Sequence, residues 1–374
     1  MSQNTVADVV KAMELAYPPH LAESWDAVGL ICGDPQDRVD TVAFALDCTD
    51  AVAEAAIEAQ ADMLIVHHPL LLRGVTGVSA NTPKGRIIHR LIRNGVALFA
   101  AHTNADAARP GVNDRLAELL GVTPGAPLRP IAEPFDKWGF TVPVEDAEQV
   151  KQAIFAAGGG SQGNYDESCF QFTVRGQFRP NQESHPHVGT RGELETVEES
   201  RIEFIAPQYK RGKIREALLR AHPYEEVAFD IVESFSKEGN RGIGRVGQLD
   251  KPMKLADFTQ RVAKRLPATQ WGVRAAGDPD AWVETVAVAS GAGDSFLGTV
   301  ASMDVDCFVT SDLRHHPVDE HLRAGGCPVI DTAHWASEFP WCEQAATTVR
   351  QATGVSTSVI DIPTDPWTIH SKDE

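Results

Sequence analysis

The chain has 374 residues, which is enough for two or three domains. Its 34 Lys and Arg residues against 52 Asp and Glu residues give a formal charge of −18, which repels a nucleic-acid backbone at long range. Hydrophobic residues make up 43% and charged residues 23%, the balance of a folded globular protein. We therefore expect no nucleic-acid partner and no wholly disordered chain.

The sequence also argues against a membrane or secreted protein. No apolar run approaches the ~20 residues that span a bilayer. Residues 1–19 lack a basic start and carry Asp8 and Glu14, which is typical of an amphipathic helix and not of a signal peptide. Six cysteines are scattered without a CxxC pair, which indicates reduced thiols. The prediction is a cytoplasmic protein that does not associate with membranes.

The first third alternates strands and helices. Short apolar runs predict strands at 41–47, 63–66 and 96–102, and the segments between them, 51–61 and 85–95, have helical composition. Strand–helix–strand spacing of this kind is typical of parallel βαβ units.

The middle of the chain has a different pattern. Residues 138–236 hold alternating strand-like segments and two helical ones, in the order strand–helix–strand–strand–helix–strand. That order is typical of a ferredoxin-like α+β domain inserted into a larger fold. The glycine- and arginine-rich stretch 239–249 is expected to be the returning linker.

The final third repeats the first. Residues 41–69 align without gaps on 285–313, an offset of 244. Six positions are identical, namely Thr41/Thr285, Val42/Val286, Ala43/Ala287, Ala45/Ala289, Asp50/Asp294 and Asp62/Asp306. We therefore predict an α/β protein in which two related lobes, 1–130 and 240–374, pack as one metal-binding domain interrupted by the insert 138–236.

Three predicted strand ends carry groups that bind metals. His67 and His68 close one strand, and they reach a common site only if the chain turns there. A second offset, of 232, aligns His102 with His334 and Asp106 with Glu338, so each lobe offers an imidazole and a carboxylate four residues apart. Each pattern alone is equally typical of a packed histidine or a helix cap. Together they favour a site for Zn²⁺, Mn²⁺ or Fe²⁺, which accept mixed nitrogen and oxygen ligands.

Other residues are weaker candidates. His315 and His316 follow a predicted strand at 307–312 and could act as ligands or as an acid and base, or they could simply begin a polar helix. Five residues are candidates for contact with a substrate, namely Trp25, Asp26, Gly291, Gly293 and Arg314. Each of them could instead have a structural role, as a cap, a turn or a packed side chain.

The motifs resemble a known family. The segments AESWDAVGLICGD (22–34), LIVHHPLL (64–71), AAHTNADAARPGVND (100–114) and VIDTAHWASE (329–338) are similar to those of the Nif-three-like family, also called GTP cyclohydrolase I type 2. In the middle, three segments resemble the CutA-like or PII-like insert of longer bacterial members, namely 163–170, 178–203 and 222–232.

The resemblance implies a dinuclear centre with two divalent ions per subunit, zinc, manganese or iron. Its metal ligands would be His67, His68, Asp106, His334 and Glu338. His102 belongs to the motif but is not a usual ligand. The resemblance also implies a toroidal homohexamer. Two departures, Ala333 and the pair at 311–312, do not fall on a ligand.

Two functions follow as hypotheses. The first is a metal-dependent hydrolase of a small molecule, such as a nucleotide or phosphate ester. In it Asp106 or Glu338 would bridge the ions, and the general acid or base would be His102, His315 or His316. The second is a metal-binding regulatory or adaptor assembly without catalysis.

Overall fold

The computed structural model describes residues 4–371, apart from the side chain of Glu238, and it confirms the α/β class. The chain divides into two compact units. The two-lobe unit comprises residues 1–131 and 240–374, and the middle unit comprises residues 132–239. Of the predicted lobes, the first three and last three residues lie outside the described residues.

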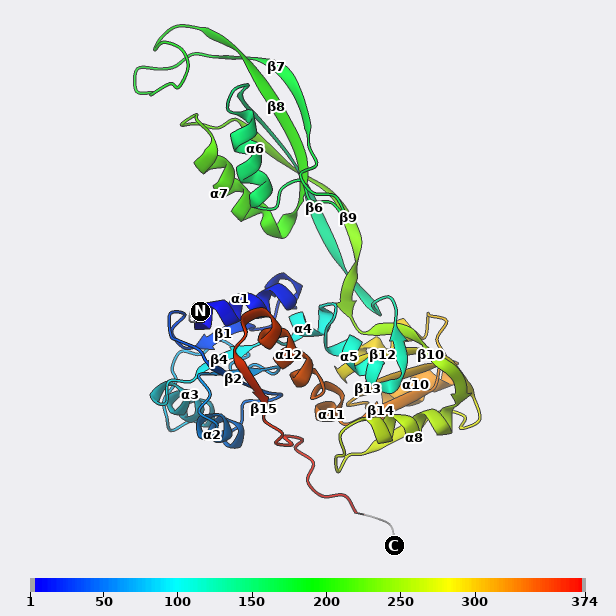
Figure 1. The fold of residues 1–374 in the computed structure, drawn as a ribbon. Coiled ribbons are helices and arrows are strands. Elements are labelled where there is room, and N and C mark those ends of the chain that lie inside the picture. The colour runs from blue at the N-terminus through cyan, green and yellow to red at the C-terminus, as the bar shows by residue number, and fades with distance from the viewer. Residues whose placement is uncertain (1–3, 372–374) are drawn as a thin grey trace. The chain divides into compact units, whose positions relative to one another are not determined.

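The first lobe is a parallel sheet covered by helices (Figure 1). Its strand order is β1-β4-β3-β2-β15, in which β2, β3, β4 and β15 run parallel and β1 is antiparallel to β4. Its elements are α1 (Val6–Ala16), β1 (Gly29–Cys32), β2 (Thr41–Ala45), α2 (Asp50–Glu58), β3 (Met63–Val66), α3 (Pro83–Arg93), β4 (Ala97–Ala100), α4 (Thr103–Ala107), β15 (Ser356–Val359) and α12 (Trp341–Thr353), which packs on β2 and β15. The predicted strands and helices of this part are confirmed, with ends that differ from the predicted ones by at most three residues.

The second lobe repeats this plan in the order β11-β14-β13-β12-β10-β5, with β12, β13 and β14 parallel. Its elements are α5 (Val112–Leu120), β5 (Val122–Pro124), β10 (Arg245–Lys254), α8 (Leu255–Arg265), β11 (Val273–Ala276), β12 (Trp282–Ala292), α9 (Leu297–Val300), β13 (Cys307–Ser311), α10 (His315–Arg323), β14 (Val329–Thr332) and α11 (His334–Glu338).

The chain returns from the middle unit to the two-lobe unit at 239/240, within the expected stretch 239–249, but this stretch forms strands and not a turn-rich linker. These residues belong to β9 (Phe229–Ile243) and β10, interrupted only at Gly244, which has a φ of 69°. Strand β10 pairs with β12 on one side and β5 on the other. Those backbone hydrogen bonds outweigh the weak strand preference of glycine.

The repeat extends to individual contacts. In the first lobe, the Asp62 carboxylate accepts hydrogen bonds from the backbone N–H groups of Asp40 and Thr41, at 2.8 and 2.9 Å. At the offset of 244, Asp306 does the same for Glu284 and Thr285, at 3.0 and 2.8 Å. Each carboxylate therefore fixes the start of the first parallel strand of its lobe.

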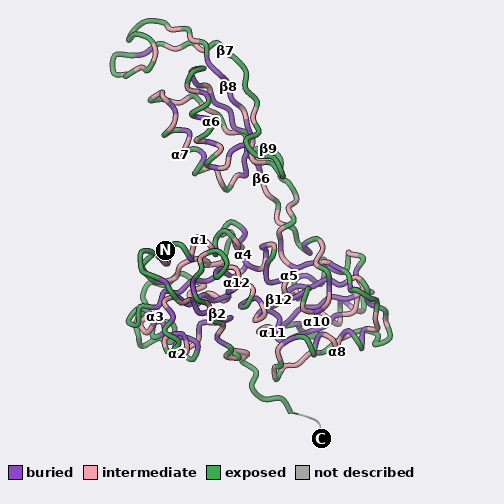
Figure 2. The backbone as a smooth tube through the Cα atoms, viewed as in Figure 1, coloured by how far each residue is buried: buried purple, intermediate pink, exposed green. Residues whose placement is uncertain are grey.

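A single hydrophobic core joins the lobes. It contains residues of both, among them Phe44, Phe99, Phe258, Val286 and Trp341, all at most 1% exposed. Buried residues, purple in Figure 2, run along the central strands β2 and β12. Because this burial is continuous, the edges of the two sheets are held in one body.

The middle unit has its own core. A sheet of order β7-β8-β6-β9 is built from β6 (Arg129–Pro143), β7 (Phe170–Phe178), β8 (Glu195–Pro207) and β9, with helices α6 (Ala147–Ala156) and α7 (Arg211–Ala221). Core residues from sheet and helices pack together, including Trp138, Phe140, Ile202, Phe204 and Leu218. Among all described residues, no helix is long and apolar enough to cross a membrane.

We predict that Arg245→Leu destabilises the two-lobe unit strongly. The Arg245 guanidinium is fully buried and donates twice to Asp114, at 2.7 Å each, and also to the carbonyls of Ala108 and two glycines. Leucine would leave buried Asp114 with only the longer ion pair to Arg109, at 3.9 Å, and losing the main partner of a buried charge costs about 3–5 kcal/mol of unfolding free energy. Urea denaturation followed by circular dichroism measures the loss.

The matched control is Arg38→Leu, because Arg38 pairs with Asp40 at the surface, where both side chains are more than half exposed. That change should cost less than about 1 kcal/mol. Equal shifts for the two variants would contradict the role given to Arg245.

Candidate metal centre

The chain turns at the end of β3 so that adjacent histidines reach one site. The backbone N–H groups of His67 and His68 both donate to the carbonyl of Leu46, at 3.1 and 2.9 Å. Sharing one acceptor breaks the strand alternation, and the two imidazole rings lie 5.0 Å apart between centroids. The sequence required a turn here for His67 and His68 to reach a common site, and the chain makes that turn.

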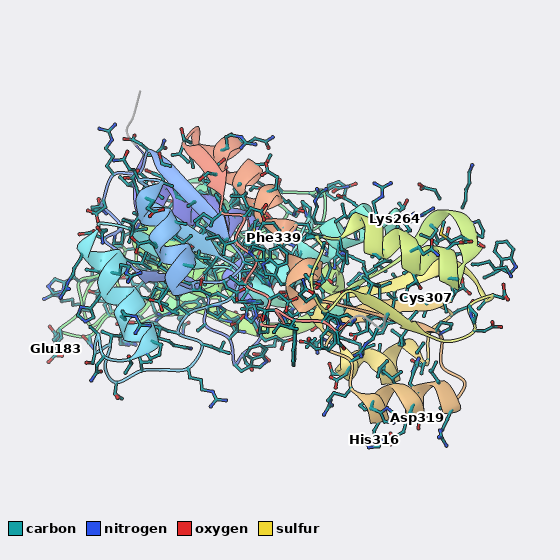
Figure 3. The ribbon with its side chains drawn as sticks, turned by 90° about the horizontal axis from the view of Figure 1, so that it is seen from below. Glu183, Lys264, Cys307, His316, Asp319 and Phe339 are labelled. Atoms are coloured by element: carbon teal, nitrogen blue, oxygen red, sulfur yellow. The ribbon has the colours of Figure 1, made fainter. Side chains whose placement is uncertain are left out.

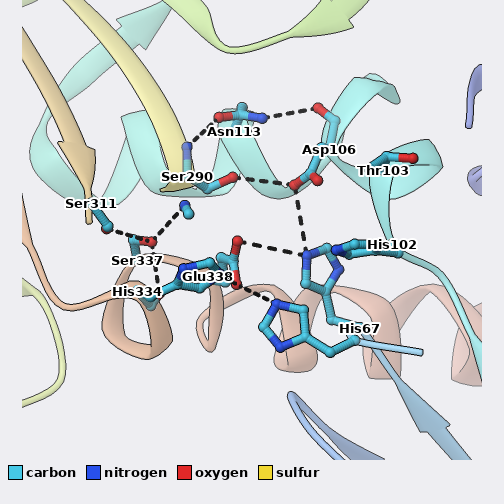
Figure 4. A network of polar contacts seen from close by, with 12 residues as sticks. His67, His102, Thr103, Asp106, Asn113, Ser290, Ser311, His334, Ser337 and Glu338 are labelled. Carbon is cyan, nitrogen blue, oxygen red and sulfur yellow. Dashed lines mark hydrogen bonds and ion pairs between the residues drawn. The ribbon is translucent and has the colours of Figure 1, made fainter. Parts of the chain in front are cut away.

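Short helices bring in the other groups. His102 is the residue before α4, and Asp106 lies within that helix. His334 and Glu338 are the first and last residues of α11, one helical turn apart. Figure 4 shows imidazoles and carboxylates from both lobes converging on one point.

Glu338 is the centre of this cluster. Its Oε2 lies 3.0 Å from His68 Nε2 and 3.1 Å from His334 Nε2, and its Oε1 lies 3.8 Å from His67 Nε2. Asp106 Oδ1 is also 3.8 Å from His67 Nε2. Two ligands about 2.1 Å from a shared ion at the tetrahedral angle lie about 3.4 Å apart. The observed separations scatter around that value.

The donors fall into overlapping groups. Three sets have ligand atoms that all lie within 4.8 Å of one another, namely His67–His68–His102, His68–His334–Glu338 and His67–Asp106–Glu338. Glu338 belongs to two of these sets and contributes a different oxygen to each. Such sharing is what a carboxylate bridging two ions requires.

Each histidine has one nitrogen anchored away from the cluster. The Nδ1 atoms pair with the Ala101 carbonyl (His67, 2.8 Å), Asp47 (His68, 2.8 Å), Asp26 (His102, 2.9 Å) and Asp312 (His334, 2.6 Å). An ionised carboxylate or a carbonyl only accepts, so Nδ1 carries the proton and Nε2 is left for the centre. Carboxylate–histidine pairs of this kind orient metal ligands and raise their basicity.

His67 provides a test of whether the site suits a metal. Its side chain is fully buried, and within residues 4–371 its Nε2 has no hydrogen-bond partner. Burial lowers the pKa of His67 to about 3, so the ring is neutral and Nε2 presents a lone pair. A buried nitrogen lone pair facing two carboxylates is costly unless a cation lies between them. The residues present therefore fit a divalent ion.

Protons occupy part of the cluster without a metal. Glu338 raises the pKa of His334 to about 11, and although burial opposes it, Glu338 with Asp47 raises the pKa of His68 to about 10. Burial and the charge of Glu338 raise the pKa of Asp106 to about 7. Burial also disfavours ionised Glu338, but His334 and His68 outweigh it and hold its pKa well below the usual range.

Gly291 leaves space for these groups. A Cβ atom there would lie 2.4 Å from Glu338 Oε1 and 3.2 Å from His334 Nε2, and its φ is +63°. Any side chain at this position would displace the carboxylate. Gly293, the other predicted glycine, lies against Thr310 instead.

The other predicted residues divide into two groups. Asp26 binds His102 and Thr103, and the exposed ring of Trp25 lies 6.0 Å from that of His102, so both adjoin the cluster. His315, His316 and Arg314 are exposed at the start of α10 and belong to none of the three ligand sets. Figure 3 shows His316 at the outer edge of the molecule. Arg314 pairs there with Asp294.

Several residues of the site were not singled out from the sequence. Asp47 and Asp312 orient His68 and His334, and Ser290 donates to Asp106 at 3.2 Å. A signal was present, because all three follow or end parallel strands at the same edge as the histidines.

A cavity of about 250 Å³ adjoins the cluster within the two-lobe unit. His68 and His334 form part of its wall, and the chain end from Thr364 to Trp367 forms another part. The Thr364 hydroxyl binds Asp47, and the rings of Trp271 and Trp367 lie 5.6 Å apart. The end of the chain is thus tied to the carboxylate that orients His68.

Known proteins are similar to this chain over nearly its whole length. The profile of the family described as Duf34/NIF3 (NGG1p interacting factor 3) matches residues 4–366. A Mycobacterium tuberculosis protein named GTP cyclohydrolase 1 type 2 homolog is 51% identical over 368 residues, 97% of each chain. Its Bacillus subtilis namesake is 35% identical over 88% of each chain.

Solved structures show the same fold. The Bacillus cereus protein related to NIF3 superposes with a TM-score of 0.83 at 32% identity, covering 99% of this chain and 100% of that one. Staphylococcus aureus protein SA1388 superposes with a TM-score of 0.77 at 29% identity, covering 99% of each chain.

We predict different metal stoichiometries for two carboxylate variants. Glu338 belongs to two ligand sets, so Glu338→Gln should weaken binding of both ions. Asp106 belongs to one, so Asp106→Asn should leave about one ion per chain. Elemental analysis after dialysis measures the content. Glu343→Gln, an exposed change of the same kind on α12, is the control. If Glu338→Gln retains two ions, Glu338 is not the shared ligand.

We predict that metal binding releases protons at neutral pH. His68 and His334, with pKa values of about 10 and 11, are protonated at pH 7 and must become neutral to bind. Binding should therefore release about two protons from these rings and about half a proton from Asp106, whose pKa is about 7. Affinity should rise with pH between 6 and 9 by about tenfold per unit for each proton displaced. Calorimetry at pH 7 in buffers of different ionisation enthalpy counts the protons. A count of zero would show that both rings are already neutral.

Proposed function

The chain belongs to the Duf34/NIF3 family, and we propose that it is a metal-dependent hydrolase with a dinuclear centre formed by His67, His68, Asp106, His334 and Glu338. The observation that carries the proposal is the sharing of Glu338 between two ligand sets whose histidines are each anchored at Nδ1. The relatives' name, GTP cyclohydrolase 1 type 2 homolog, supports a small-molecule substrate such as a nucleotide or phosphate ester.

Two divalent ions in such a site would lower the pKa of water and polarise the oxygen of the bond that is broken. The protein itself supplies a proton carrier beside them. Asp26 holds His102 at Nδ1, which leaves His102 Nε2 able to take or give a proton. Although Asp26 is partly buried, hydrogen bonds from His102 and Thr103 keep its pKa well below the usual range. Through this contact Asp26 holds the His102 ring in one orientation, with Nε2 turned away from Asp26.

The cavity indicates how a substrate would lie. Asp47, Asp312 and Asp365 contribute to its wall, so a second anionic group is disfavoured there. Trp271, Trp335 and Trp367 offer aromatic surface. We infer that an uncharged organic part of the substrate enters this cavity, while the anionic group to be hydrolysed lies at the cluster.

The alternative is a metal-binding assembly without catalysis, in which the middle unit senses a ligand. The middle unit has a core of its own, and none of the five proposed ligands belongs to it, which favours this alternative. It predicts metal binding with no turnover. The toroidal homohexamer and the cytoplasmic location stay predictions, and light scattering of the purified protein tests the first of these.

We predict that His102→Gln lowers kcat without loss of metal. Removing a general acid or base costs about 10²–10⁴-fold in rate. The assay uses metal-depleted protein reconstituted with Mn²⁺, Zn²⁺ or Fe²⁺, screened against phosphate monoesters and nucleotides, with GTP ring opening followed separately. His316→Asn, on exposed α10, should match the wild type. No turnover with any reconstituted metal favours the alternative, and an unchanged His102→Gln rate removes the role of His102.

A further inference from the structure

The middle unit contains the larger cavity, of about 590 Å³. It lies on the sheet face opposite the helices. In the pairing of β7 with β8, Val174 lies opposite Glu199, whereas Gln171 lies opposite the core residue Ile202. Because residues alternate along a strand, Glu199 projects from the face away from the core. The loop at 179–188 and residues 224–226 complete the wall.

Glu199 is a buried acid at this cavity. Glu199 is only 6% exposed. Its carboxylate lies over Gly176, and a Cβ atom added to Gly176 would be 2.5 Å from Glu199 Oε2. Among the described residues, no Lys, Arg or His nitrogen lies within 4.0 Å of it. A buried carboxylate without a counter-ion costs free energy, which a bound cation would recover.

Neighbouring polar groups do not neutralise Glu199. His222 uses both ring nitrogens, since Nε2 donates to the Thr141 carbonyl at 2.8 Å and Nδ1 accepts from the Tyr224 N–H at 3.1 Å. Burial lowers the pKa of His222, so the ring is neutral. Burial and the Glu199 carboxylate beside it raise the pKa of Tyr224, so the Tyr224 hydroxyl stays protonated next to Glu199 and does not cancel its charge.

Two arginines also line the cavity. Arg179 donates to the Gly192 carbonyl at 2.8 Å. Arg175 lies in register with Glu198, so its side chain leaves the strand on the other face of the sheet from Glu199. Glu225 and Glu226 add negative charge to the wall.

Aromatic rings border the same space. The ring centroid of Tyr224 lies 6.3 Å from that of Phe178 and 6.1 Å from that of His187, and all three residues line the cavity. Aromatic faces attract cations that have left water, and they pack against an aliphatic stem. Buried negative charge and aromatic surface together select a ligand that is cationic at one end and apolar along its length.

We propose that this cavity of the middle unit binds a small organic cation, an ammonium or guanidinium group on an apolar stem, with Glu199 as its counter-ion. The Tyr224 hydroxyl lies beside that charge and the aromatic rings flank the stem. This site is independent of the metal centre, whose ligands all belong to the two-lobe unit.

The test uses the full-length protein and butylguanidine as the probe, with butylurea as the neutral analogue and butyrate as the anionic one. Ligand-observed NMR and calorimetry measure binding. The wild type should bind butylguanidine saturably and bind neither analogue detectably at the same concentration. Glu199→Gln should weaken butylguanidine binding at least about tenfold, because a charge-assisted contact is lost.

The matched control is Glu198→Gln, an exposed neighbour on the same strand whose side chain lies on the opposite face. It removes the same charge and should change affinity less than about twofold. Gly176→Ala, which places a methyl group against the Glu199 carboxylate, and Tyr224→Phe should both weaken binding, with the fold verified by circular dichroism.

Equal weakening by Glu198→Gln and Glu199→Gln would overturn the proposal, since general charge and not the cavity would then attract the probe. Binding of butylurea as tight as that of butylguanidine, or no saturation of the wild type, would overturn it too. A change of oligomeric state in Glu199→Gln, measured by light scattering, would assign the carboxylate to contact with a second copy of the chain instead.

Discussion

Parallel strands that end at a common edge are the constraint on which the site depends. Each lobe has three consecutive parallel strands, and every one of the six delivers a polar group at its carboxyl end. These groups are Asp47 after β2, His67 and His68 after β3, His102 after β4, Ser290 within the end of β12, Asp312 after β13 and His334 after β14. The shared core holds the two edges facing each other, so no long loop is needed to assemble the donors.

Much of this arrangement could be predicted from the sequence, because it rests on periodicity and repetition. The apolar runs near residues 41 and 63 form the expected parallel strands, and the aligned acids Asp62 and Asp306 make the same contacts in both lobes. The α/β class follows from that order. Family membership was also recognisable, because its motifs fall on the strand ends.

The rest depended on three-dimensional contacts. His316 and His68 both follow strands in the sequence, yet only the second turns into the cluster, because its backbone N–H bonds back to Leu46. Gly244 was interpreted as part of a linker, since glycine propensity says nothing of the two strands that pair beside it. From the sequence alone, protons would be expected to compete with metal ions for the histidine nitrogens only below the reference histidine pKa of about 6.5. Glu338 shifts it far higher for His334, and only the distance between them reveals this.

The acidic composition connects the two proposed sites. A net charge of −18 creates a potential that draws cations toward the protein and repels free anions. Each site then holds a buried carboxylate, Glu338 in the two-lobe unit and Glu199 in the middle unit, that gains from an external positive charge. They differ in what surrounds that carboxylate. Imidazole nitrogens around Glu338 offer lone pairs that can coordinate a metal ion. Aromatic rings near Glu199 have no such lone pairs, but their faces attract an organic cation. An anionic substrate can approach the first site only after metal ions reverse its local charge, which makes metal loading the step that admits such a substrate.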